Sequence, residues 1–184
     1  MKTNAFYNCK NLTTIDFPSL ISAGTDAFRS CTSLKNVNLP LYKHMEDHTF
    51  RDCTSLEELH LPSLEGICSY CMNGCSNLHT IDAPNVTYFG YMPFNGARIT
   101  KAIFPLLRST GTRGFARCWA LVETDFSSLP TVNNNDFEGC SSLIKLDFPA
   151  VSLIKASGFS GCGKLTTLIL RNNALCTLEN TNAF

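Results

Sequence analysis

Length, composition and charge exclude several classes of protein. The chain has 184 residues, of which 44% are hydrophobic and 16% charged, and 15 basic residues balance 15 acidic ones to a formal net charge of zero. Without a basic surplus the chain has little with which to neutralise phosphates, so nucleic acid is excluded as a partner. The sequence also lacks a continuous apolar run of about 18 residues, and we expect no membrane insertion.

An aromatic position recurs along the whole chain. The spacing is 22 residues at every step except one of 21, and the column consists of Phe6, Phe28, Phe50, Met72, Phe94, Phe115, Phe137 and Phe159. A cysteine follows most of these positions after three residues, and a leucine follows after three more. A fixed period of this length is typical of a solenoid, in which each unit buries its apolar face against the next unit.

The elements of one unit can be followed from Leu12 to Cys31. Ile15 and Phe17 have the alternate spacing of a strand, and Pro18 stops that strand because proline cannot donate to a ladder. A second, short extended segment follows. It ends at Gly24, where we expect a left-handed corner. The segment from Phe28 onward then turns the chain back, as a short helical or 3₁₀ turn.

Stacking of these units predicts a parallel sheet along the solenoid and a continuous internal stack of the aromatic column. Proline recurs at the strand ends of most units but is replaced by Ser127 and Arg171. The period is broken between Phe94 and Ile99 and again after Arg171. We interpret both breaks as drift in a tolerant repeat, although bends and binding sites also occur at irregular turns.

The unit from Leu12 to Cys31, LTTIDFPSLISAGTDAFRSC, resembles the BspA-like leucine-rich repeats, and the resemblance covers essentially the whole chain. It implies a β-rich leucine-rich repeat solenoid of the α/β class. It further implies a right-handed superhelix with parallel strands, about eight turns of about 22 residues and short helical or 3₁₀ turns. The family is found mainly in surface-exposed proteins, so the resemblance implies a cell-surface or secreted location and a role in adhesion or binding. It supplies no catalytic residue and no cofactor.

Residues 1–184 are expected to form a single domain that is an excerpt of a longer protein. The chain enters and leaves the repeat in mid-unit, and residues 1–4 contain no apolar core of a signal peptide. Neither end shows the polar capping unit that solenoids need. End-to-end self-association is therefore a prediction for this chain.

An outward column of polar residues on the predicted strands is the candidate binding site. The polar residues of this column are Asp16, Asn38, His60, Asp82, Asp125 and Asp147. Its two remaining positions are occupied by Ile103 and Ile169. The sheet face of a solenoid is its usual binding surface, so this strip is predicted to recognise a protein or other macromolecule, for example a basic one. The alternative is a solvated polar face that keeps the sheet soluble.

The ten cysteines favour a buried ladder over a disulfide framework. Seven of them share one column, where side chains point in parallel and cannot easily reach disulfide geometry. Cys68, Cys71, Cys75 and His79 have a spacing compatible with zinc, but Cys75 belongs to the buried column. We therefore expect no metal site. His44 and His48 are likewise interpreted as solvated residues.

The sequence contains no nucleophile elbow, phosphate loop or convergent His/Asp/Ser set. We therefore expect a protein without enzymatic activity. The preferred hypothesis is a binding or adhesion module that uses the strand face. The alternative is a structural spacer or stalk segment within a longer repeat array.

Overall fold

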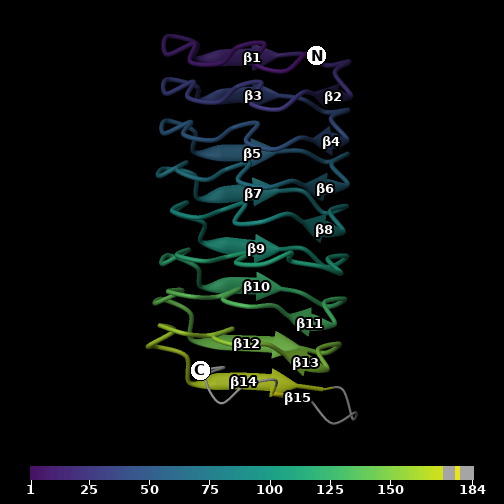
Figure 1. Cartoon of the computed structure of the whole chain (residues 1–184), viewed down its shortest axis with the longest axis vertical. Helices are drawn as coiled ribbons and strands as arrows, with labels where there is room; N and C mark the ends of the chain where they lie inside the picture. Colours follow the sequence, from purple (N-terminus) through teal and green to yellow (C-terminus); the bar gives the residue numbers. More distant parts are fainter. Residues whose placement is uncertain (172–176, 179–184) are drawn as a thin grey trace.

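The computed structural model describes residues 1–171 and 177–178 and forms a solenoid whose turns stack along the longest axis (Figure 1). Eight strands of the described residues line one face of the stack, one from each successive unit. They are β1 (Thr14–Asp16), β3 (Asn36–Asn38), β5 (Glu58–His60), β7 (Thr80–Asp82), β9 (Lys101–Ile103), β10 (Glu123–Asp125), β12 (Lys145–Phe148) and β14 (Thr167–Leu170). All of their pairings are parallel, which confirms the predicted repeat solenoid.

A second set of short strands follows the first set around each turn. They are β2 (Ser22–Ala23), β4 (His44–Met45), β6 (Gly66–Ile67), β8 (Tyr88–Phe89), β11 (Thr131–Val132), β13 (Leu153–Ile154) and β15 (Thr177–Leu178). The segments that return the chain are hydrogen-bonded turns, and no helix occurs in the residues that are described. The expected helical or 3₁₀ turns are thus wrong. Amides in these segments instead bond partly to the neighbouring turn, as Phe28 does to the Thr49 carbonyl at 2.9 Å.

The strand face is divided into pairs and does not form the expected continuous sheet. β1 pairs with β3, β5 with β7, β9 with β10 and β12 with β14. The amide of Asn36 donates to the Thr13 carbonyl at 3.1 Å, whereas the equivalent amide of Glu58 donates to no backbone carbonyl. We call the three unpaired boundaries, β3/β5, β7/β9 and β10/β12, the seams. The second strand set is more continuous, since β2, β4, β6 and β8 form one sheet.

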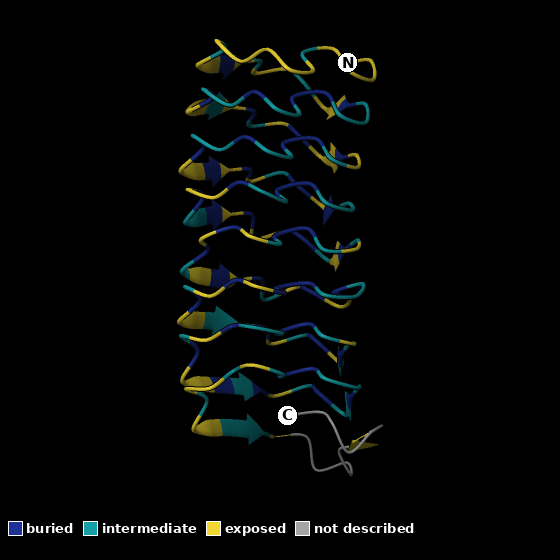
Figure 2. Ribbon diagram, turned by 60° about the vertical axis from the view of Figure 1, so that its left-hand side comes forward, coloured by how far each residue is buried: buried dark blue, intermediate teal, exposed yellow. Residues whose placement is uncertain are grey.

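The aromatic column packs as the repeat predicts. The rings of Phe28 and Phe50 are stacked with their centroids 5.4 Å apart, and those of Phe115 and Phe137 with theirs 5.5 Å apart. Met72 replaces the ring between the two halves of this stack and is fully buried. Figure 2 shows buried residues in the turns between the two ends of the stack, whereas the first turn is mostly exposed and β14 has no buried residue. Burial of each such side chain contributes about 1.5–3 kcal/mol.

The cysteine column forms a ladder of free thiols. Each thiol that is buried in this column donates to the backbone of a phenylalanine on the preceding turn; for example, Cys53 Sγ lies 3.1 Å from the Phe28 carbonyl oxygen. Cys75 makes the same bond to Phe50 at 3.0 Å. Burial raises the pKa of the Cys75 thiol to about 12, so it stays protonated and can donate. The nine described cysteines are all free.

The corner glycines serve close packing more than the left-handed backbone that we expected. Gly24 and Gly90 do not have positive φ, and a Cβ at either would lie 2.6 Å from a backbone nitrogen of the neighbouring turn. The left-handed residues come two positions later, as at His48 with φ 59° and Tyr70 with φ 57°. Close approach of adjacent turns therefore excludes a side chain at Gly24 and Gly90, whereas Gly111 at the same corner has the expected positive φ of 65°. Other turns place larger residues such as Glu46 and Lys155 at this position.

A buried polar network joins Thr110 and Gly114 to residues of the next turn, and the repeat pattern did not predict it. Thr110 takes a column that is otherwise apolar, and Asp136 takes a column of mostly small residues; both are fully buried. The Asp136 carboxylate accepts hydrogen bonds from the Gly114 amide at 3.0 Å, from the Asn133 amide at 2.6 Å and from the Thr110 hydroxyl. Burial raises the pKa of Asp136 to about 6, and these hydrogen bonds offset part of the increase.

Candidate binding face

The strand face consists of the outward-pointing side chains of the first strand set, and it contains every residue of the predicted site. Asp16 lies in register beside Asn38, and His60 beside Asp82, with all four exposed. Asp125 and Asp147 are half-buried and lie beside isoleucines on their paired strands. The structure thus places the six residues in one column.

Acidic side chains predominate on this face although the whole chain is neutral. The two outward columns contain six acids, namely Asp16, Glu58, Asp82, Glu123, Asp125 and Asp147, and two lysines, namely Lys101 and Lys145. One of the lysines is engaged locally, since Lys101 Nζ lies 2.7 Å from Glu123 Oε2. The face is therefore complementary to a ligand with positive charge.

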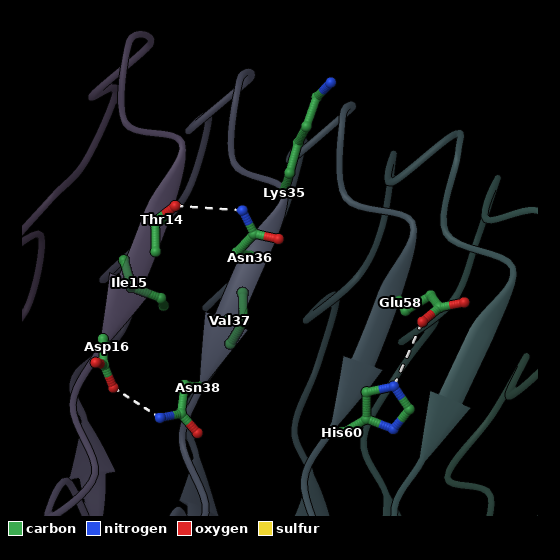
Figure 3. Close-up of a pocket in the computed structure, with 9 residues that line it drawn as sticks. All are labelled: Thr14, Ile15, Asp16, Lys35, Asn36, Val37, Asn38, Glu58 and His60. Carbon is green, nitrogen blue, oxygen red and sulfur yellow. Dashed lines mark hydrogen bonds and ion pairs between the residues drawn. The ribbon is translucent and has the colours of Figure 1, made fainter.

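The first half of the face is hollowed beside the seam between β3 and β5 (Figure 3). Nine residues of β1, β3, β5 and the Lys35 position line a shallow depression of about 330 Å³. On one side of the seam Asn38 donates to Asp16 at 2.7 Å, and on the other side His60 Nε2 lies 3.5 Å from Glu58 Oε2. Figure 3 shows no bond that crosses the seam between these two groups of residues. A ligand could contact both rows at once.

The second half has two hollows beside the seam between β10 and β12. The larger, of about 390 Å³, is lined by Thr124, Asp125, Ser127, Asp147, Pro149 and Arg171. The smaller, of about 250 Å³, is lined by Val122, Glu123, Thr124, Lys145 and Asp147. Because Thr124 and Asp147 line both, the two hollows are adjacent and are described together as one groove. We call it the β10–β12 groove.

Only Asp125 and Asp147 of this groove were predicted as site residues, and three of the others depart from the repeat pattern. Ser127 and Arg171 stand where other repeats have proline, and Thr124 is the polar member of an otherwise apolar inward column. Arg171 Nε donates to Asp147 Oδ1 at 3.0 Å, and Ser127 donates to Asp125. Departures from the repeat pattern were therefore the signal that could have identified these positions.

The cysteine and histidine motifs do not form a metal site. Cys71 and Cys75 are buried and donate to backbone carbonyls, and His48 stacks on Tyr70 with centroids 5.2 Å apart. In the residues described, no three or more His, Cys, Asp or Glu side chains are grouped so that they could hold a metal ion.

The described part of the chain also has no helix that is long and apolar enough to cross a membrane.

Comparison with known proteins gives one family and several similar folds. The family model for a BspA type leucine rich repeat region matches residues 1–122 and 108–184. A leucine rich cell surface protein from Faecalibacterium prausnitzii A2-165 has a similar structure, with a TM-score of 0.56 and 17% identity over 93% of this chain and 76% of that one. A leucine-rich repeat protein from Eubacterium ventriosum ATCC 27560 gives a TM-score of 0.58 and 16% identity, over 92% and 70%. Comparison with curated protein sequences gave no match.

Proposed function

Because the chain belongs to the BspA-type leucine-rich repeat family, we propose that it is a non-enzymatic binding module that recognises a macromolecule through its strand face. The observation that carries the proposal is the strand face itself, where acidic and amide side chains of β1, β3, β5, β10 and β12 line shallow hollows. Such a face presents contacts along a surface and does not concentrate reactive groups in a deep cleft. Leucine-rich repeat proteins generally mediate protein interactions, so a protein is the proposed ligand.

A location at the cell surface or outside the cell accompanies this proposal. It is supported by the family and by the structural similarity to a leucine rich cell surface protein from Faecalibacterium prausnitzii. Adhesion is the form of binding that fits this location. The proposed surface would then face other proteins, and not the lipid bilayer.

The test is selection of binders from a displayed library of random peptides on the immobilised chain. One variant carries Asp16→Lys and Asp125→Lys, one substitution in each half of the strand face. A matched control carries Glu46→Lys and Glu65→Lys, which change the charge equally at exposed positions outside that face. Binders should lose most of their affinity for the strand-face variant and keep it for the control. Selected peptides that bind the strand-face variant as well as the unmodified chain, yet fail on the control, would refute the proposal.

A spacer or stalk role is the second candidate. The observation that favours it is the apolar surface of the first turn, where Phe6, Leu12 and Phe17 are half-buried while the same columns are buried from the second turn to Phe159. In this role the first turn would stack on a neighbouring repeat. Growth of mass with concentration supports this role, whereas loss of peptide binding in the strand-face variant supports the binding module.

A further inference from the structure

The β10–β12 groove combines an apolar end with a charged end. At the apolar end, Val122 lines the groove. Ile144 occupies the equivalent position on the next turn, directly before the lining residue Lys145, and the two side chains are 53% and 55% exposed. The same position on the earlier turns is polar, with Thr13, Lys35, Glu57, His79 and Thr100. Trp119, three residues before Val122, is 48% exposed and lies under the Arg98 guanidinium. Exposed aliphatic and aromatic side chains of this kind mark interaction surfaces when they gather at one place.

The charged end has a carboxylate without a basic partner. Asp147 is paired with Arg171, and Glu123 with Lys101. Asp125 accepts hydrogen bonds from the Ser127 amide and hydroxyl, and no described basic side chain forms an ion pair with it. Among the described residues, the groove therefore has one acid, Asp125, without an ion pair, and one base, Lys145, that also forms none. A basic group of a ligand would find its complement there.

The seam gives the groove its depth. No backbone hydrogen bond joins β10 to β12, and the amides of Ile144 and Lys145 lack the bond that their equivalents Val122 and Glu123 make to the Thr100 carbonyl, at 3.0 and 3.2 Å. Thr124 stands at the bottom in place of the leucine or isoleucine that most other turns have there. Val122 directly precedes β10 and Asp125 ends it, and this separation of three extended residues places the two ends roughly 10 Å apart.

We propose that the β10–β12 groove binds an extended peptide segment of a partner protein in which an aliphatic side chain precedes a basic side chain by two residues. The aliphatic side chain would contact Val122 and Ile144, and the basic one would pair with Asp125. Side chains at alternate positions of an extended peptide point the same way about 7 Å apart, and a long basic side chain covers the remaining distance. The inference rests on the proposed function and assigns it a ligand class and a location.

The experiment is an amide chemical-shift titration of the whole chain with acetyl-leucyl-glycyl-arginine amide. We expect saturable shifts centred on residues 122–127 and 144–149, with a Kd of about 1 mM or weaker because the ligand is so small. Two control peptides divide the contacts: acetyl-leucyl-glycyl-glutamine amide lacks the charge, and acetyl-glycyl-glycyl-arginine amide lacks the aliphatic side chain. The Kd of each control peptide should be at least about three times that of acetyl-leucyl-glycyl-arginine amide.

Variants locate the site. Asp125→Asn should weaken the arginine peptide about two- to fivefold but leave the glutamine peptide unchanged. Val122→Thr, which restores a polar residue found at this position on other turns, should weaken both leucine peptides. Asp16→Asn on the first half of the face is the control and should change nothing.

Equal binding of all three peptides, or no saturable shift, would overturn the inference. Shifts centred on β1, β3 and β5 and abolished by Asp16→Asn would also overturn it, but the strand face would then remain a binding face. Failure of the proposed function itself would appear differently, as selected peptides that bind the strand-face variant as tightly as the unmodified chain.

Discussion

At the residue scale, Asp136 combines a charged group with complete burial. Its pKa is raised from 3.8 to about 6, so the folded protein holds the proton more tightly than the unfolded chain does. The stabilisation from this group is fully present below about pH 4 and is lost as the pH rises through about 6. A shift of about two pKa units corresponds to roughly 3 kcal/mol. The carboxyl group of Asp136 thus favours folding in weak acid.

We predict that Asp136→Asn removes this pH dependence. The free energy of unfolding of the unmodified chain, taken relative to that of Asp136→Asn, should fall by about 2–3 kcal/mol between pH 4 and pH 7. Urea denaturation of both proteins at the two pH values measures this difference. The lost hydrogen bonds lower the stability of the variant by a constant amount that cancels in the comparison. An unchanged difference between the two proteins would show that Asp136 does not titrate in this range.

Single residues also show which part of the site could be read from the sequence. Asp16, Asn38, His60 and Asp82 lie in one outward column because strand periodicity and a fixed repeat determine both face and neighbour. Thr110 and Asp136 come into contact because they lie on adjacent turns of the solenoid. The repeat pattern does not reveal such a pair, since each residue appears only as a single exception in its own column.

At the element scale, the repeat predicts where strands lie but not how they pair. Every unit has the same pattern, and nothing in it distinguishes the bonded pair β1 and β3 from the seam between β3 and β5. The left-handed residue of the corner was also predicted two positions too early. We expected it at Gly24, but the positive φ is at Asp26, and Gly24 lacks a side chain because it lies close to Thr3.

The seams lead to a prediction for amide hydrogen exchange. The amides of Asn36, Thr80, Glu123 and Thr167 donate to carbonyls of the preceding turn at 3.1–3.3 Å, whereas the equivalent amides of Glu58, Lys101 and Lys145 donate to none. Hydrogen-bonded amides exchange only after local opening. We expect exchange at the second group to be at least about tenfold faster, so that protection alternates along the stack.

Native-state exchange followed by NMR measures this alternation. The amide of Phe28, which bonds to Thr49 at 2.9 Å inside the core, is the slow reference. Uniform protection of all seven strand amides would mean that the face forms one continuous sheet in solution. The hollows beside the seams would then be shallower than described, and the proposed groove would lose its depth.

At the scale of the whole molecule, charge and end surfaces act together. The formal net charge is zero and the isoelectric point is about 6.9, so long-range repulsion between copies is minimal near neutral pH. The first turn carries Phe6, Leu12 and Phe17 half-buried against the core. A second copy could cover these side chains and extend the aromatic stack, which makes self-association the expected behaviour of the isolated chain.

We predict that the mass measured by light scattering rises with concentration at pH 7 and rises less at pH 9, where the chain is negatively charged. Leu12→Lys should suppress this growth because it places a charge on the first turn. Leu41→Lys is the matched control, since it adds the same charge at an exposed leucine on the second turn, away from the end of the stack. Equal suppression by both variants would mean that charge alone governs association. A monomer of constant mass would show that the first turn needs no partner, and the spacer hypothesis would then lose the observation that favours it.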